Sequence, residues 1–223
     1  MSFNIAIDGP AGAGKSSAAR KAAKELGFLY VDTGAMYRTI ALYLLRNQVD
    51  VGDESALRRS LDDIDVGMSY ENGVQHTFLN SEDVTELIRE QEVSEMASRS
   101  SAHPAVRQKL LDLQRDLAAR ENVLMDGRDI GTAILPDADL KIFLTASVQE
   151  RARRRYLEMV QKGESCSLEQ IRKEIEERDY RDTHREVSPL RQAEDALLLD
   201  TTGMSCQQVV EKIVSLAKER IHV

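Results

Sequence analysis

Hydrophobic residues along the chain gather in five short runs that are almost continuously apolar. This pattern is typical of parallel strands that are covered on both faces, because a strand with one wet face would alternate. Four runs end in or just before an aspartate, and ligands of such sheets bind beyond the carboxyl ends of the strands. The expected strands are Phe3–Ile7, Phe28–Val31, Val123–Met125, Leu140–Leu144 and Ala196–Leu199.

Helical patterns fill the segments between these strands. Ser16–Leu26 stops at Gly27, which suits the left-handed residue that follows a helix. A second helix runs from His103 through Ala119 with a proline in its first turn, where the missing N–H costs nothing. Leu168–Tyr180 follows Ser167, a good N-cap. The other expected helices are Met36–Arg46, Val148–Gln161 and Cys206–Arg220.

One segment interrupts the alternation of strand and helix. Asp65–Tyr70 and Val74–Leu79 flank Asn72-Gly73, and Asn-Gly between two strand patterns is a strong hairpin signal. An antiparallel hairpin does not belong inside a parallel array. We therefore expect residues 38–104 to form a small α+β insertion, with residues 1–37 and 105–223 forming the core.

Composition narrows the class of protein. A chain of 223 residues with 42% hydrophobic and 30% charged residues suits one α/β domain with a modest insertion. The formal net charge of −8 argues against a nucleic-acid partner, which needs a broad basic surface. The apolar stretches are too short to span a membrane, and the N-terminus lacks a signal-peptide pattern. The two cysteines, Cys166 and Cys206, have no metal-ligand spacing, so we expect free thiols in the cytoplasm.

A phosphate-binding motif follows the first strand. Gly9-Pro10-Ala11-Gly12-Ala13-Gly14-Lys15-Ser16 matches G-x-x-x-x-G-K-[ST] between a strand and a helix, which predicts a P-loop NTPase-type fold. Backbone N–H groups of such a loop and the start of its helix cradle phosphates. The motif places Lys15 at the β- and γ-phosphates and the Ser16 hydroxyl at Mg²⁺. A chance Gly-rich turn is the alternative, and the context disfavours it.

Clustered arginines predict a second anion site. No Asn-Lys-x-Asp tetrapeptide, the base-reading motif of guanine-nucleotide switches, occurs in the sequence. Arg38 and Arg128 follow strand ends on the ligand side of the sheet. Arg178, Asp182 and Arg185 share one face if their helix continues that far. The alternative is that each of these residues is an ordinary solvated charge. For Arg178, Asp182 and Arg185 we give this alternative about the same weight as an anion site.

Together these segments closely resemble the bacterial type of cytidylate kinase, in order over nearly the whole chain. One departure is Ser16-Ser17, where relatives carry Gly-Thr, although Ser16 still offers a hydroxyl. The segments that carry the resemblance are Gly9–Ser17, Asp32–Arg38, Ala102–Pro104 with Val106-Arg107, Asp126–Gly131, Lys141–Leu144 with Glu150–Ala152, and Glu177–Pro189.

The resemblance implies a fold and an activity. The fold would be α/β, with a parallel five-stranded sheet, helices on both faces, an insertion that binds the nucleoside monophosphate, and a short lid at about residues 153–166. The activity would be transfer of the γ-phosphate of ATP, with Mg²⁺, to CMP and also dCMP. The implied partners are these small molecules alone, with no nucleic acid and no membrane, and the implied state is a monomer.

The resemblance also implies roles for individual residues. The ATP-binding loop would comprise Gly9, Pro10, Ala11, Gly12, Ala13, Gly14, Lys15, Ser16 and Ser17. Thr33 would lie at the ribose and phosphate, and Arg38, Arg128 and Arg178 would hold the CMP phosphate. Asp182 would accept from the ribose hydroxyls. The cytosine edge would be read by Ser98, in a segment that offers three serines, and by Arg107 and Arg185 with Asp129 nearby.

Basic residues on the Val148–Gln161 helix resemble the arginines that close over the transferring phosphoryl group. Arg151, Arg154 and Arg155 fit this role, whereas Arg153 interrupts the pattern. Arg151 and Arg154, together with Lys15, Arg128 and Arg178, are the expected catalytic residues. The alternative, to which we give the same weight, is that these arginines form a basic helix face exposed to solvent. His184 is interpreted as a surface residue.

Two other functions stay open. The nearest is a P-loop kinase for another small acceptor, such as UMP, a sugar acid or shikimate. The other is a non-catalytic nucleotide-sensing module, which would turn ATP over slowly and without stimulation by any acceptor. Direct in-line transfer needs alignment and charge neutralisation, and a phosphate acceptor is already a nucleophile, so no general base is expected.

Overall fold

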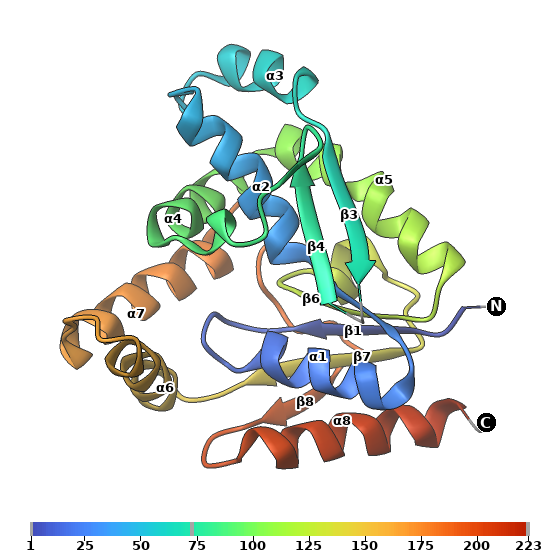
Figure 1. Ribbon diagram of the computed structural model, residues 1–223. Helices are drawn as coiled ribbons and strands as arrows, with labels where there is room; N and C mark the ends of the chain where they lie inside the picture. The colour runs from blue at the N-terminus through green and yellow to red at the C-terminus, as the bar shows by residue number, and fades with distance from the viewer. Residues whose placement is uncertain (1, 72–73, 222–223) are drawn as a thin grey trace.

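A computed structural model of the chain describes residues 2–71 and 74–221. Its centre is a five-stranded parallel sheet with β1 in the middle (Figure 1). The expected α/β fold is thus confirmed, and each strand lies within one or two residues of its predicted position. Across the sheet the strands are β2 (Leu29–Asp32), β6 (Val123–Gly127), β1 (Asn4–Asp8), β7 (Leu140–Thr145) and β8 (Leu197–Asp200).

Alternate residues of the central strands enter two separate cores. Ile5 and Ile7 pack with one set of helices, whereas Ala6 between them packs with the other. This explains why the strands are apolar throughout. One face is covered by α1 (Lys15–Leu26) and α8 (Cys206–Ile221), and the other by α2 (Thr33–Arg46) and α5 (Pro104–Arg120) (Figure 1).

The expected hairpin is present as β3 (Val66–Glu71) and β4 (Val74–Leu79), paired antiparallel. The Asn72-Gly73 turn lies outside the described residues. A short third strand, β5 (Glu82–Asp83), extends this sheet. The segment also holds elements that the hydrophobic pattern did not predict, namely α3 (Glu54–Asp62), η1 (Leu87–Arg89) and α4 (Gln91–Ser100).

The segment that contains the hairpin packs on the core through α2. This helix starts at the end of β2, so the boundary expected between residues 37 and 38 falls inside it. Buried residues of the hairpin segment, such as Leu57 and Leu79, belong to the same hydrophobic cluster as Val31 and Met125 of the central sheet. The division into core and insertion stays a proposal.

Two helices form an antiparallel pair beyond the carboxyl ends of the strands (Figure 1). They are α6 (Val148–Gln161) and α7 (Leu168–His184), and α7 is four residues longer than expected. Asp182 therefore lies within the helix, one turn after Arg178. Arg185 is the C-cap with extended backbone, so it leaves the helical face on which we expected it.

Candidate functional site

The loop between β1 and α1 is built around glycines. Gly14 caps α1 in the left-handed conformation, with a φ of 89°. Gly9 has a φ of 149°, and a Cβ on it would come within 1.9 Å of the Leu144 carbonyl oxygen of the neighbouring strand. Only glycine avoids both the backbone strain and this collision. The geometry explains why the motif has glycine at these positions.

Lys15 lies in the first turn of α1, and its side chain folds back over the loop. Its Nζ donates a hydrogen bond to the Pro10 carbonyl oxygen at 2.7 Å, and the residue is 5% exposed. Burial, followed by the nearby Arg128, lowers the pKa of Lys15, although Asp126 and Asp8 oppose the shift. The ammonium thus lies over the loop, close enough to Arg128, an arginine expected at the acceptor, for their charges to interact.

A hydroxyl-rich site surrounds Asp126, at the carboxyl end of β6. Its Oδ2 accepts from the Ser16 hydroxyl and its Oδ1 from the Tyr30 hydroxyl, both at 2.8 Å. The Thr33 hydroxyl donates to the Asp126 backbone carbonyl. Burial and the charge of Asp32 raise the pKa of Asp126. We expected neither Asp126 nor Tyr30 in the site, although Asp126 was one of the aspartates at strand ends.

Oxygen atoms that could coordinate Mg²⁺ are thus present at the start of α1. A magnesium ion keeps several waters and takes only one or two protein oxygens besides the phosphates of its nucleotide. The Ser16 hydroxyl beside the Asp126 carboxylate meets that need. In residues 2–71 and 74–221 no three histidine, cysteine, aspartate or glutamate side chains are grouped so that they could hold a metal ion by themselves. The donors therefore fit a metal that arrives with a nucleotide.

Three of the expected phosphate-binding arginines converge from separate elements. Arg38 of α2 pairs with Asp32 at 3.1 Å, and Arg128, just after β6, donates to Asp182 of α7 at 2.9 Å. The Nε of Arg178 is buried and has no hydrogen-bond partner within the described chain. Burial, and then Arg128 among other arginines, lowers the pKa of Arg178 to about 10.

This arginine cluster is incompletely neutralised. Among the described residues, Arg38 pairs with Asp32 and Arg128 with Asp182, while Arg181 adds further positive charge to Arg178. Burial raises the pKa of Asp182, but Arg128 and Arg178 outweigh that effect and keep it below its ordinary value. A buried guanidinium among like charges costs free energy unless an anion joins it. The arrangement therefore favours binding of a phosphate.

Beyond this cluster, two further arginines converge on Asp129. Arg107 of α5 forms an ion pair with one carboxylate oxygen, and Arg185 donates to the other at 3.4 Å. The three side chains are all at most 8% exposed. Burial and the like charge of Arg107 lower the pKa of Arg185. The structure thus brings together three of the four residues expected at the base.

Tyr37 is a residue that the sequence analysis did not assign to the site. Its ring lies 5.6 Å from the Arg107 guanidinium, and its hydroxyl is buried without a hydrogen-bond partner among the described residues. Burial raises its pKa to about 12. The expected Ser98 hydroxyl is likewise buried and unpaired in the part of the chain described, and Arg107 reaches the Ser101 carbonyl oxygen instead.

Two of the three expected lid arginines contact the P-loop, whereas the third, Arg155, is partly exposed and reaches Gln91 and Glu158 instead. Arg151 donates to the Ala11 carbonyl oxygen at 3.1 Å and binds the Asp179 carboxylate through both terminal nitrogens. Arg154 donates to the Ala13 carbonyl oxygen at 3.2 Å and to Thr201. Arg153, by contrast, is largely exposed. The two α6 arginines that we expected to be catalytic, Arg151 and Arg154, therefore lie beside the nucleotide loop.

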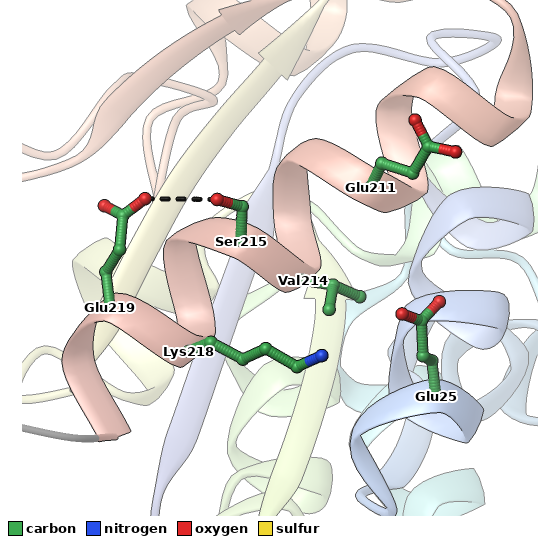
Figure 2. A pocket seen from close by; sticks show the side chains of 6 residues that line it. All are labelled: Glu25, Glu211, Val214, Ser215, Lys218 and Glu219. Atoms are coloured by element: carbon green, nitrogen blue, oxygen red, sulfur yellow. Dashed lines mark hydrogen bonds between the residues drawn. The ribbon is translucent and has the colours of Figure 1, made fainter.

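One hollow in the surface adjoins the candidate site residues, and another lies away from them. One of about 270 Å³ is lined by Ser16, Tyr30, Asp32 and Arg38 together with residues of β4 and η1, so it adjoins the site. The other, of about 530 Å³, lies between α1 and α8 and is lined by Glu25, Glu211, Val214, Ser215, Lys218 and Glu219 (Figure 2).

The second hollow is distant from the P-loop. Glu25 follows Lys15 by ten residues of helix, roughly 15 Å along the axis. The lining of this hollow holds three glutamates against one lysine, so the hollow would repel phosphate. It is therefore not the functional site.

No helix in the described ranges has the length and apolar character that a membrane crossing requires.

Comparisons with known proteins agree with this geometry. The cytidylate kinase family model matches residues 5–219. Cytidylate kinase from Carboxydothermus hydrogenoformans is 51% identical over 214 residues, which is 96% of each chain. Cytidylate kinase from Streptococcus pneumoniae strain 70585 is 52% identical over 221 residues, covering 98% of this chain and 99% of that protein.

One solved structure supports the fold alone. The crystal structure of an uncharacterised protein from Eubacterium ventriosum matches with a TM-score of 0.55 and 14% identity, over 99% of this chain and all of that one.

Proposed function

The chain belongs to the cytidylate kinase family, and its activity is the ATP-dependent phosphorylation of CMP to CDP; we propose the side chains that perform each part of that reaction. We also propose that dCMP is accepted and that the enzyme acts as a monomer in the cytoplasm. The observation that supports the acceptor assignment best is the buried, unpaired Nε of Arg178 within a cluster of like charges.

The donor would bind in the P-loop. Backbone N–H groups of residues 9–17 would cradle its phosphates, and Lys15 would neutralise the β- and γ-phosphates. Ser16, supported by Asp126, would hold the Mg²⁺ that accompanies ATP and offsets phosphate charge. Arg151 and Arg154 lie at the loop carbonyls, where their guanidinium groups could reach the transferring phosphoryl group as the lid closes.

The acceptor would bind between α2, the segment after β6, and α7. Arg38, Arg128 and Arg178 would hold its phosphate through paired N–H donors, which suit phosphate oxygens better than a lysine does. Thr33 lies beside this cluster through its bond to the Asp126 carbonyl. Asp182, which accepts from Arg128, has a second oxygen that could accept from a ribose hydroxyl.

The base would be read by Arg107 and Arg185, positioned by Asp129, with Ser98 and Tyr37 nearby. Arginine only donates hydrogen bonds, and cytosine offers N3 and O2 as adjacent acceptors. Uracil carries a proton at N3, so one donor would face another. An unpaired buried group costs about 1–3 kcal/mol. A preference for CMP over UMP of at least about tenfold should follow.

The first prediction concerns this preference. Arg107→Ala and Arg185→Ala should each lower kcat/KM for CMP far more than for UMP, because they remove donors that only cytosine satisfies. The measurement is kcat/KM for both nucleotides in the parent and the variants. Arg120→Ala is a matched control, since Arg120 is exposed on the same helix as Arg107 and pairs with Asp116 of that helix. An unchanged CMP/UMP ratio in both variants would place base recognition elsewhere.

A further inference from the structure

A buried carboxylate that the proposed reaction does not use joins the two halves of the site. Asp8 is the last residue of β1, directly before Gly9 of the P-loop, and is 5% exposed. Its Oδ1 accepts from the backbone N–H of Ile130 at 2.7 Å, and its Oδ2 accepts from that of Gly131 at 2.8 Å. Both bonds span more than 120 residues of sequence.

These two N–H groups belong to the first turn of a π-helical segment, η2 (Ile130–Ile134). The N-terminal N–H groups of a helical turn are usually satisfied by the side chain of its N-cap residue. Here the N-cap is Asp129, and its side chain makes no such bond among the described residues. Instead the Asp129 carboxylate binds Arg107 and Arg185. Asp8 performs the capping in its place.

We propose that Asp8 is a positioning residue for the acceptor: its ionised carboxylate fixes the backbone of residues 129–131, and thereby places Asp129 with its two arginines beside the P-loop. The inference rests on the acceptor site proposed above. Asp8 and Gly9 are consecutive, so the backbone that Asp8 holds lies beside the start of the phosphate-binding loop. A Cβ on Gly131 would lie 3.4 Å from Asp8 Oδ2, so the two chains are in close contact.

Charged residues approach Asp8 from α1, from the loop after β6 and from β7. Opposite it in the sheet are Gly127 and Phe143, which are uncharged. Lys15 of α1 lowers its pKa and Asp129 raises it. Lys141 of β7 has its stem beside Gly131, but its ammonium binds the Pro136 carbonyl oxygen and Asp195. Within the described chain, Asp8 forms no ion pair.

Burial dominates these influences and raises the pKa of Asp8 from 3.8 to about 6, although both backbone hydrogen bonds oppose the shift. Because the folded protein binds this proton more tightly than the unfolded chain, its stability falls as pH rises from about 4 to about 6. At neutral pH Asp8 is thus ionised, and its buried charge lowers the stability of the folded protein. Such a cost is typical of a group retained for function.

Asp8→Asn tests the proposal. An asparagine can accept only one of the two bonds and turns an N–H donor toward the other, so KM for CMP should rise about tenfold. The kcat should change less, and the Kd for ATP without CMP should stay within about twofold. Asp139→Asn is the matched control. Asp139 accepts from the Asn4 N–H at the opposite end of β1, although it is exposed, and its replacement should leave KM unchanged.

The pH profile distinguishes positioning from a purely structural role. Protonation of Asp8 in the parent mimics the asparagine. The parent-to-variant ratio of kcat/KM for CMP should therefore fall from about tenfold at pH 8 to about twofold at pH 5. Titration of the CMP phosphate affects both proteins and cancels in the ratio. A ratio that is independent of pH, or an equal loss of ATP affinity, would overturn the proposal.

A second measurement tests the proposal even if the Asp8→Asn variant does not fold. In the parent, amide exchange of Ile130 and Gly131, corrected for the intrinsic pH dependence, should lose protection as pH falls through about 6. Constant protection would contradict the role of Asp8. Failure of the proposed acceptor site looks different, because Arg107→Ala and Arg185→Ala would then leave the CMP/UMP ratio unchanged, while the exchange result would stand independently.

Discussion

Lys15→Ala should lower kcat by about a thousandfold, because it removes the side chain that neutralises charge on the transferring phosphates. The structure places its Nζ over the loop, bonded to the Pro10 carbonyl oxygen. Folding should survive the change. Burial lowers the pKa of Lys15, so the folded state gains little from this charge. The measurement is ADP release at saturating ATP and CMP, with thermal unfolding as the check on folding.

Lys21→Ala is the control for this prediction. Lys21 lies on the same helix but is exposed, on the surface away from the loop. Its removal should leave turnover within about twofold, the range expected of surface substitutions. A folded Lys15→Ala protein with near-parent turnover would refute the P-loop assignment.

Arg178→Lys should raise KM for CMP by about tenfold to a hundredfold and also lower turnover. Lysine keeps the charge but loses the planar pair of donors that fits phosphate oxygens. Arg128→Lys should act in the same direction. ATP affinity in the absence of CMP should hardly change, since among the described residues neither side chain donates a hydrogen bond to the P-loop backbone. Arg172→Lys is the control, because Arg172 of the same helix is partly exposed and its guanidinium pairs with Glu169 and Glu176.

A second readout separates a phosphate ligand from a structural arginine. Arg178 is buried among like charges, so Arg178→Met should raise the unfolding temperature of the ligand-free protein while weakening CMP binding. Stabilisation of the parent by added CMP should be lost in this variant. If Arg178→Met instead lowered the unfolding temperature and kept CMP stabilisation, the residue would be structural. Loss of ATP binding would move it to the donor site.

The strands and most helices could be predicted because their signals are local. Runs of apolar residues, Gly27 and Ser167 mark elements without knowledge of the fold, and the structure places these boundaries within a few residues. The helix α3 was missed although Asp53 accepts from its first N–H groups, since its apolar stripe consists of little more than Leu57 and Leu61.

The positions of the candidate site residues could be predicted where a motif or helical spacing fixes them, and less well where they depend on distant partners. Lys15 and Ser16 lie within a recognisable loop. Arg178 and Asp182 lie on one helical face, as spacing predicted, but Arg185 follows the helix end and still reaches Asp129. Asp8 could not be predicted as a cap. Its partners lie across the sheet, and only the folded register brings them together.

Product stoichiometry with a panel of acceptors tests the central claim most directly. Purified protein is supplied with ATP, Mg²⁺ and in turn CMP, dCMP, UMP, shikimate or a sugar acid, and both ADP and the phosphorylated acceptor are quantified. We expect one CDP for each ADP, rapid turnover with CMP, and at least about tenfold lower efficiency with UMP. Equal efficiency with UMP, faster turnover of another acceptor, or slow ADP release that no acceptor stimulates would contradict the account.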